Sequence, residues 1–170
     1  MPRLVGSEMC IRDRYNYMSE FNLNAISPID GRYATITSEL QDYFSEYALI
    51  KYRIKVEIEY FISLCEFDLP QLKNFNKRNF SKLREVYSNF NMKDARSVKL
   101  IEKKTNHDVK AVEYFIKQKF NDLNIGEYSE FIHFGLTSQD INNTAIPLIL
   151  KDILQEVYFD KIDNILKALD

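Results

Sequence analysis

The stretch Thr137-Ser138-Gln139-Asp140 begins the longest run of regularly spaced apolar residues in the chain. A hydroxyl residue three positions before an acid is the pattern of a capping box, in which the two side chains bond orphan backbone amides at a helix start. Apolar residues then recur at three- and four-residue steps as far as Leu169, which is the period of an amphipathic helix. The pattern predicts a helix over residues 141–169, roughly 43 Å long at 1.5 Å per residue.

A helix of this length is unusual for so short a chain. A compact domain of 170 residues has a diameter of about 40 Å, so the helix is expected to extend beyond its own domain. It reaches Asp170 without a C-cap glycine or another stop signal, which indicates a chain cut within a long helix. Pro147 lies inside the pattern and is expected to kink the helix, because it cannot donate a backbone hydrogen bond.

Helical periodicity also dominates the rest of the chain. It predicts helices over residues 40–65, 80–90, 92–103 and 109–120, with a short aromatic-rich connection at residues 129–135. The helix that begins at residue 109 follows a second capping-box pattern, Thr105-Asn106-His107-Asp108. No strand pattern competes anywhere. The predicted fold class is therefore all-α.

The two capped helix starts carry the functional signal. The exposed start of a helix is partly positive, so it is a natural place to bind an anion. Two such starts precede successive long helices, and the first contains His107. Together they predict a site for a multiply charged substrate.

Composition places the chain among globular proteins and excludes several classes of partner. A net charge of −2 and a pI near 5.8 give no basic surface for nucleic acid or an anionic membrane. No apolar run reaches the roughly 18 residues that span a bilayer. The two cysteines, Cys10 and Cys65, cannot build a disulfide framework and fit a reducing cytosol. We expect Cys65 to be a buried or half-buried structural thiol.

Residues 1–17 are predicted to be a non-native segment. The letters LVGSEMCIRDR at residues 4–14 resemble the in-frame translation of a transposase-type sequencing adapter. They have neither helical nor strand periodicity, and they lack the apolar core of a signal peptide. Met18 is therefore interpreted as the native start, and the alternative is a genuine basic N-terminal arm.

Three blocks carry a resemblance to a known family. They are residues 27–33 (SPIDGRY), residues 105–114 (TNHDVKAVEY) and residues 131–143 (FIHFGLTSQDINN). In this order and spacing, the chain from residue 18 to residue 170 resembles the N-terminal part of the adenylosuccinate lyase family, within the fumarase/aspartase superfamily. The Thr-Ser-x-Asp block alone indicates only the superfamily, whereas the other two are more specific to the adenylosuccinate branch.

The resemblance implies a β-elimination that uses no metal and no organic cofactor. Members of the family cleave a C–N bond in adenylosuccinate to give AMP and fumarate. They also release fumarate from the succinylo-carboxamide ribotide of purine synthesis. The resemblance further implies a cytoplasmic homotetramer, an N-terminal helical domain over residues 18–127, and the truncated start of a central helical-bundle domain at residues 128–170.

The family's substrate contacts fall on seven positions: Arg32, Tyr33, Asn106, His107, Asp108, Thr137 and Ser138. Arg32 and Tyr33 match its contact to the phosphate end of the nucleotide, where a planar guanidinium suits bidentate binding. Asn106, His107 and Asp108 match the second substrate-contacting block, in which His107 would help orient or protonate the substrate, supported by Asp108. Thr137 and Ser138 match the block that holds a succinyl carboxylate through hydroxyl and backbone donors.

The family's main proton-transfer groups have no counterpart in this chain. Its catalytic acid is a histidine in a Thr-His loop and its base is a serine in a mobile loop; neither motif occurs here. These 170 residues alone are therefore expected to be inactive. His133 is expected to pack or hydrogen-bond near the site, and Lys110 and Glu113 to support their neighbours. Two alternatives stay open: a sister lyase acting on argininosuccinate, fumarate or aspartate, and a non-catalytic helical interaction module.

Overall fold

The computed structural model describes residues 24–67 and 69–169. The chain divides into two compact units, residues 1–39 and 40–170. The predicted adapter segment and the native start predicted at Met18 lie outside the described residues. The domain boundary predicted at residues 127 and 128 falls inside the second unit, and it stays a prediction about the whole protein.

The described part of the first unit is a succession of turns, the conformation that its cluster of Pro, Asp and Gly favours. The Gly31 amide donates to the Ser27 carbonyl and the Tyr33 amide to the Pro28 carbonyl, both at 3.0 Å. The guanidinium of Arg32 lies over the Tyr33 ring, 4.7 Å from its centroid. These two predicted substrate residues therefore present one cation beside one aromatic ring.

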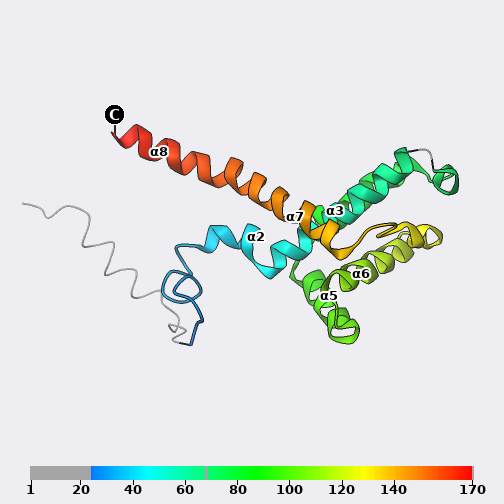
Figure 1. Cartoon of the computed structure of the whole chain (residues 1–170), viewed down its shortest axis with the longest axis horizontal. Helices are drawn as coiled ribbons and strands as arrows, with labels where there is room; N and C mark the ends of the chain where they lie inside the picture. Colours follow the sequence, from blue (N-terminus) through cyan, green and yellow to red (C-terminus); the bar gives the residue numbers. More distant parts are fainter. Residues whose placement is uncertain (1–23, 68, 170) are drawn as a thin grey trace, which may run out of the picture. The chain divides into compact units, whose positions relative to one another are not determined.

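The helices of the described residues confirm the all-α prediction, and no strand occurs among residues 24–67 and 69–169 (Figure 1). In chain order they are η2 (Ser38–Leu40), α2 (Gln41–Phe44), α3 (Glu46–Glu66), η3 (Pro70–Leu72), η4 (Lys77–Asn79), α4 (Phe80–Ser88), α5 (Met92–Thr105), α6 (Asp108–Asp122), η5 (Gly126–Phe131), α7 (Ser138–Ile153), η6 (Leu154–Tyr158) and α8 (Phe159–Leu169). The predicted connection at residues 129–135 is partly a 3₁₀ helix, because η5 ends at Phe131.

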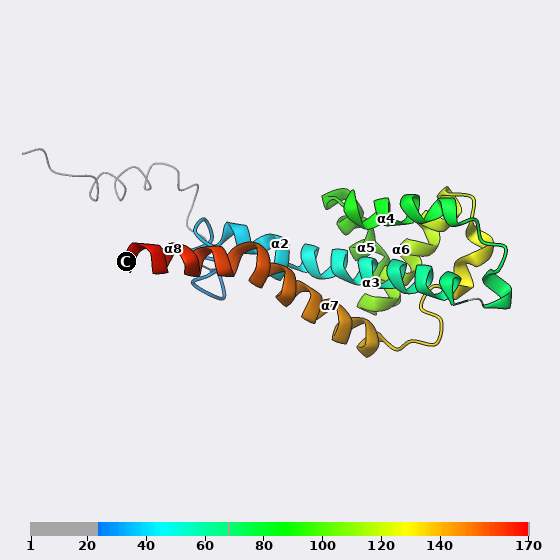
Figure 2. The same cartoon turned by 90° about the horizontal axis from the view of Figure 1, so that it is seen from above.

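The second unit is built around α3. The hydroxyl of Ser45 caps its start by accepting the Ala48 amide at 3.1 Å. Helices α4, α5, α6 and α7 all contact α3, and Figure 2 shows α7 running beside it. Because neighbours surround α3, buried apolar residues occur along most of its length: Ala48, Ile50, Tyr52, Ile54, Val56, Ile58, Phe61, Ile62 and Cys65.

Two clusters of buried apolar side chains join these helices. In the larger cluster the ring of Phe61 meets the rings of Phe75 and Phe120 edge to face, with centroids 5.2 and 4.9 Å apart. Cys65 lies in the same cluster as a buried free thiol, which confirms its predicted role. Burial raises the pKa of this thiol to about 11. The smaller cluster joins α3 to α6 and α7 and contains Tyr52, Val56, Val109, Ile141, Ala145 and Ile149.

The prediction that Thr105 caps the following helix is wrong. Thr105 is the last residue of α5, and Asn106 follows as a left-handed C-cap with φ of 52°. Asparagine tolerates this conformation better than most residues, so the chain turns here. His107 is extended and is itself the N-cap of α6. The Thr105-to-Asp108 stretch is therefore a tight link between two helices rather than a capping box.

The capping box predicted at Thr137 and Asp140 is confirmed. Thr137 accepts the Asp140 amide, while the Asp140 carboxylate accepts the Thr137 amide at 2.7 Å. The helix that follows runs through Pro147 and continues, by way of η6, into α8. η6 is a π-helical segment: the Phe159 amide donates to the Leu154 carbonyl five residues earlier. None of the described residues of α8 is buried, and its apolar side chains are exposed or half-buried within residues 40–169.

The contact between α3 and α6 supplies a stability prediction. Phe120→Ala should lower the free energy of unfolding by about 3–5 kcal/mol, because it removes a fully buried ring and leaves a cavity beside Phe61. Phe67→Ala is the matched control, since Phe67 is 78% exposed. Urea unfolding of the whole protein, followed by circular dichroism, measures both. Equal midpoints for the two variants would contradict the described core.

Candidate functional site

The starts of α6 and α7 meet in space, as the sequence pattern requires of a shared anion site. Nε2 of His107, the N-cap of α6, lies 3.4 Å from Oγ of Ser138, the first residue of α7. Both side chains are accessible to solvent, and that of His107 is about half exposed. Two polar groups on separate helices can therefore contact a single ligand here.

His107 combines a structural role at one ring nitrogen with a second ring nitrogen that faces Ser138. Its Nδ1 accepts the backbone amide of Lys110 at 3.1 Å. A nitrogen that accepts a hydrogen bond carries a lone pair, so the proton of the neutral ring belongs to Nε2. The helix cap therefore presents an N–H donor toward Ser138 and the space beside it.

Thr137 and Ser138 provide donors of a different kind. The capping box satisfies the amide of Asp140, but the first two helical residues, Ser138 and Gln139, have no carbonyl one turn back within the helix. Their amides and the Ser138 hydroxyl point along the partly positive end of α7. Such an arrangement suits a carboxylate or a phosphate oxygen.

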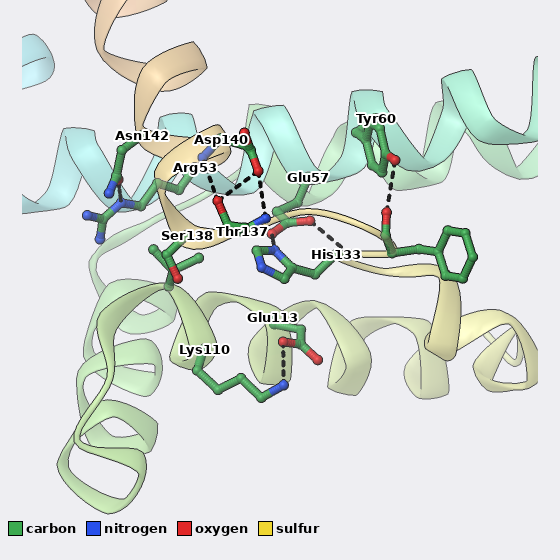
Figure 3. Close-up of polar contacts among 12 residues, drawn as sticks. Arg53, Glu57, Tyr60, Lys110, Glu113, His133, Thr137, Ser138, Asp140 and Asn142 are labelled. Atoms are coloured by element: carbon green, nitrogen blue, oxygen red, sulfur yellow. Dashed lines mark hydrogen bonds and ion pairs between the residues drawn. The ribbon is translucent and has the colours of Figure 1, made fainter.

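Three polar residues of α3, Arg53, Glu57 and Tyr60, face this region (Figure 3). They stand at i, i+4 and i+7, so they share one face of the helix. Arg53 and Glu57 are 5% and 1% exposed. Tyr60 donates its hydroxyl hydrogen to the Phe134 carbonyl at 2.9 Å. α3 thus contributes to the site as well as to the core.

Arg53 contacts both converging helices. Its Nη2 lies 2.8 Å from Oδ2 of Asp108, and its Nε donates to Oδ1 of Asn142 at 2.9 Å. Partial burial acts to raise the pKa of Asp108. The amide of Val109 and the Arg53 guanidinium outweigh that effect and lower the pKa below its ordinary value of 3.8. Asp108 is therefore a structural carboxylate at neutral pH.

Glu57 fixes the loop that precedes α7. One of its oxygens lies 2.5 Å from Nδ1 of His133, and the other accepts the His133 backbone amide at 3.1 Å. His133 has a left-handed φ of 60°, a conformation that costs a non-glycine residue about 1–2 kcal/mol. Burial raises the pKa of Glu57, although its hydrogen bonds with His133 act in the opposite direction. The predicted hydrogen-bonding role of His133 is confirmed.

The remaining predicted residues have distinct places. Asn106, His107 and Asp108 line an open cavity of about 570 Å³, together with Glu46, Lys99, Glu102 and Lys103. Lys110 and Glu113 form an ion pair at 2.7 Å, as their supporting role predicts. Arg32 and Tyr33 belong to the first unit, and their participation in the same site stays a prediction.

Sequence reasoning missed Arg53, Glu57, Tyr60 and Asn142. Arg53 and Glu57 looked like the solvated side of an amphipathic helix, because acids and bases alternate with apolar residues there. The available signal was their spacing: two opposite charges one turn apart on a helix whose other faces are apolar. Only the packing of α6 and α7 on that face shows that they are buried.

Among residues 24–67 and 69–169, no group of three or more His, Cys, Asp or Glu side chains could hold a metal ion. Within the same residues, no helix is both long enough and apolar enough to cross a membrane.

Comparisons with known proteins agree with this geometry. A family model described as "Lyase" matches residues 31–170. An adenylosuccinate lyase of Dictyostelium discoideum is 55% identical over 153 residues, which cover 87% of this chain and 33% of that protein. Adenylosuccinate lyases of Legionella pneumophila (strain Corby) and Escherichia coli (strain K12) are 45% and 42% identical, over 86% and 80% of this chain.

The chain belongs to this lyase family, since the family model covers most of its length. It spans about a third of the length of the curated relatives that it matches. The matched part is 33% of the Dictyostelium and Legionella proteins and 30% of the Escherichia coli protein. The helical architecture and the paired helix starts are therefore features of a lyase segment.

The Arg53–Asp108 pair supplies a pH prediction. A carboxyl whose pKa is lowered by folding stabilises the folded state above its unfolded pKa, and that stabilisation is lost as the pH falls through the folded pKa. Asp108→Asn should therefore destabilise the whole protein at neutral pH. The difference from the unmutated protein should shrink below a pH of about 4. Thermal melts across pH test this, and a difference that grows on acidification would contradict it.

Proposed function

We propose that the whole protein is an adenylosuccinate lyase, which eliminates fumarate from adenylosuccinate to leave AMP. By the same reaction it would release fumarate from the succinylo-carboxamide ribotide of purine synthesis. The observation that carries this proposal is the meeting of His107 and Ser138 at two helix starts, in a chain up to 55% identical to adenylosuccinate lyases. Substrates with a phosphate and two carboxylates need several anion-binding groups, which such helix starts provide.

In this proposal each predicted residue has a specific contact. Thr137 and Ser138 bind a succinyl carboxylate through their hydroxyls and the first amides of α7. His107 donates a hydrogen bond from its Nε2–H to the substrate, and the adjoining residues Asn106 and Asp108 shape that side of the pocket. Negative charge grows on the succinyl part as its proton leaves, so these donors bind the transition state more strongly than the substrate.

Arg32 and Tyr33 would bind the phosphate end. A guanidinium can donate two parallel hydrogen bonds to a phosphate, and the neighbouring ring of Tyr33 supports the orientation of the Arg32 fork. The acid and base that move protons would come from parts of the protein outside these 170 residues. The described segment then binds substrate but does not turn it over.

The whole protein is further proposed to be a cytoplasmic homotetramer. The exposed apolar side chains near the end of the long helix support assembly, because contiguous exposed apolar surface marks an interaction site. They include Leu154, Tyr158, Phe159, Ile165, Leu166 and Leu169, which are 41–79% exposed in residues 40–169. Size-exclusion chromatography with light scattering measures the assembly directly.

The activity test uses the complete reading frame. The purified protein should release fumarate from adenylosuccinate, detected by absorbance, and should not act on argininosuccinate, aspartate or malate. Release from argininosuccinate alone would favour a sister lyase. A complete protein that is active on none of these substrates would favour a non-catalytic helical module.

His107 supplies the site prediction. His107→Asn should keep the helix cap, since asparagine is a strong N-cap residue, but it removes the Nε2 donor. We expect kcat/KM to fall by at least about 10²-fold, the usual cost of a lost transition-state donor. His107→Ala should show the same loss and also a lower melting temperature. Near-normal turnover of His107→Asn would remove His107 from the site.

A further inference from the structure

We infer that Arg53 is a positioning residue: its buried guanidinium sets the separation of His107 and Ser138 by binding α6 and α7 at the same time. This inference rests on the proposed function and adds a residue to its site. Arg53 itself lies on α3 and is 5% exposed. It therefore acts through its two partners rather than on the substrate.

The positions of those partners give the inference its force. Asp108 is the first residue of α6 and directly follows His107. Asn142 lies four residues after Ser138, one helical turn along α7 and on the same face. Arg53 therefore contacts α6 next to His107, at 2.8 Å from Asp108. It contacts α7 one turn after Ser138, at 2.9 Å from Asn142.

The chemistry of the side chain suits this task. A guanidinium is planar and presents donors in fixed directions, so Nε and Nη2 define the relative placement of two acceptors. A lysine ammonium lacks the fork and would favour the charged partner, Asp108, over the neutral amide of Asn142. Only the arginine is expected to bind both helices.

A purely stabilising role fits less well. Buried ion pairs are weak contributors to stability, because the attraction is largely offset by the loss of hydration. An apolar side chain of similar length, such as methionine, could fill the same volume. What methionine cannot do is fix the directions of Asp108 and Asn142. Arg53→Met also leaves Asp108 without its counter-charge, so it should lower stability as Asp108→Asn does. A positioning role requires, in addition, a loss of kcat in the protein that remains folded.

The chain offers a matched control on the opposite side of this question. Arg84 makes an equally short pair, with Nε and Nη2 at 2.8 and 2.9 Å from the two carboxylate oxygens of Glu59. Glu59 is on α3, as Arg53 is, but the Arg84–Glu59 pair contacts none of the predicted substrate residues. The Arg84 side chain is about half exposed, so Arg84→Met reports the loss of an arginine pair with α3 at the surface, and Asn142→Ala reports the loss of a contact at the buried Arg53.

The experiment compares Arg53→Met, Arg53→Lys, Asn142→Ala and Arg84→Met in the whole protein, with fumarate release from adenylosuccinate as the assay. We expect kcat to fall by about 10²-fold in Arg53→Met, as for a small misplacement of reacting groups. KM should change less, because the helix starts that attract the anion remain. Arg53→Lys should recover part of the loss, and Arg84→Met should keep the original kcat.

A double variant separates positioning from independent effects. If Arg53 acts partly through Asn142, the losses in kcat of Arg53→Met and Asn142→Ala should overlap instead of multiplying in the double variant. Full multiplication, or an original kcat in Arg53→Met, overturns the inference. Arg53→Met could melt at a lower temperature than Arg84→Met. In that case the test uses the two milder variants, Arg53→Lys and Asn142→Ala. An unchanged kcat in both of them overturns the positioning role of Arg53.

Failure of the inference is distinguishable from failure of the proposed function. An unmutated complete protein that releases no fumarate from adenylosuccinate refutes the proposed function. An active unmutated protein whose kcat is insensitive to Arg53 and Asn142 refutes the positioning role and leaves the proposed function standing.

Discussion

Two helix starts with the same partial positive charge lie within hydrogen-bonding distance of each other. The other polar residues of the described site hold them together against their mutual repulsion. The partly positive ends of α6 and α7 repel each other when they are brought as close as His107 and Ser138, 3.4 Å apart. Acids in the first turns, Asp108 and Asp140, offset the repulsion. These carboxylates reduce the repulsion between the two helix ends, and a bound anion would neutralise the remaining positive charge.

α3 carries the mechanical part of this arrangement. Its apolar faces pack into both clusters, while the stripe of Arg53, Glu57 and Tyr60 reaches α6, α7 and the loop between η5 and α7. One rigid helix therefore sets both the spacing of the helix starts and the path of the loop. A site fixed by a buried helix is more precise than a site built on loops alone.

Local patterns were sufficient for the fold class and for the chemistry of one helix start. The all-α class, the buried Cys65 and the Thr137 capping box follow from periodicity and near-neighbour spacing, and the structure confirms them. The predicted cap at Thr105 was wrong because this sequence is compatible with two structures: a capping box that begins at Thr105, and a left-handed turn at Asn106. Asn106 takes the left-handed conformation, which moves the helix start to His107. The residue spacing alone could not decide between a left-handed Asn106 and a helix cap formed by the Thr105 hydroxyl.

The buried polar residues needed information that no local pattern contains. Arg53 is 55 positions from Asp108 and 89 positions from Asn142 in the chain. Similarly, Glu57 and His133 are 76 positions apart. Whether a charged residue on an amphipathic helix is solvated or buried depends on what packs on that face. The helix starts were thus readable from sequence, and their supports were not.

The π-helical segment at Leu154–Tyr158 has a consequence for the phase of the long helix. Along α7 the buried stripe runs through Ile141, Ala145, Ile149 and Ile153 at four-residue steps. The half-buried apolar residues that follow are Val157 and Ile162, which are five residues apart. A regular α-helix would turn a residue at this step away from the stripe, whereas the wider π turn takes up one extra residue. The stripe of α7 therefore continues across η6 onto α8.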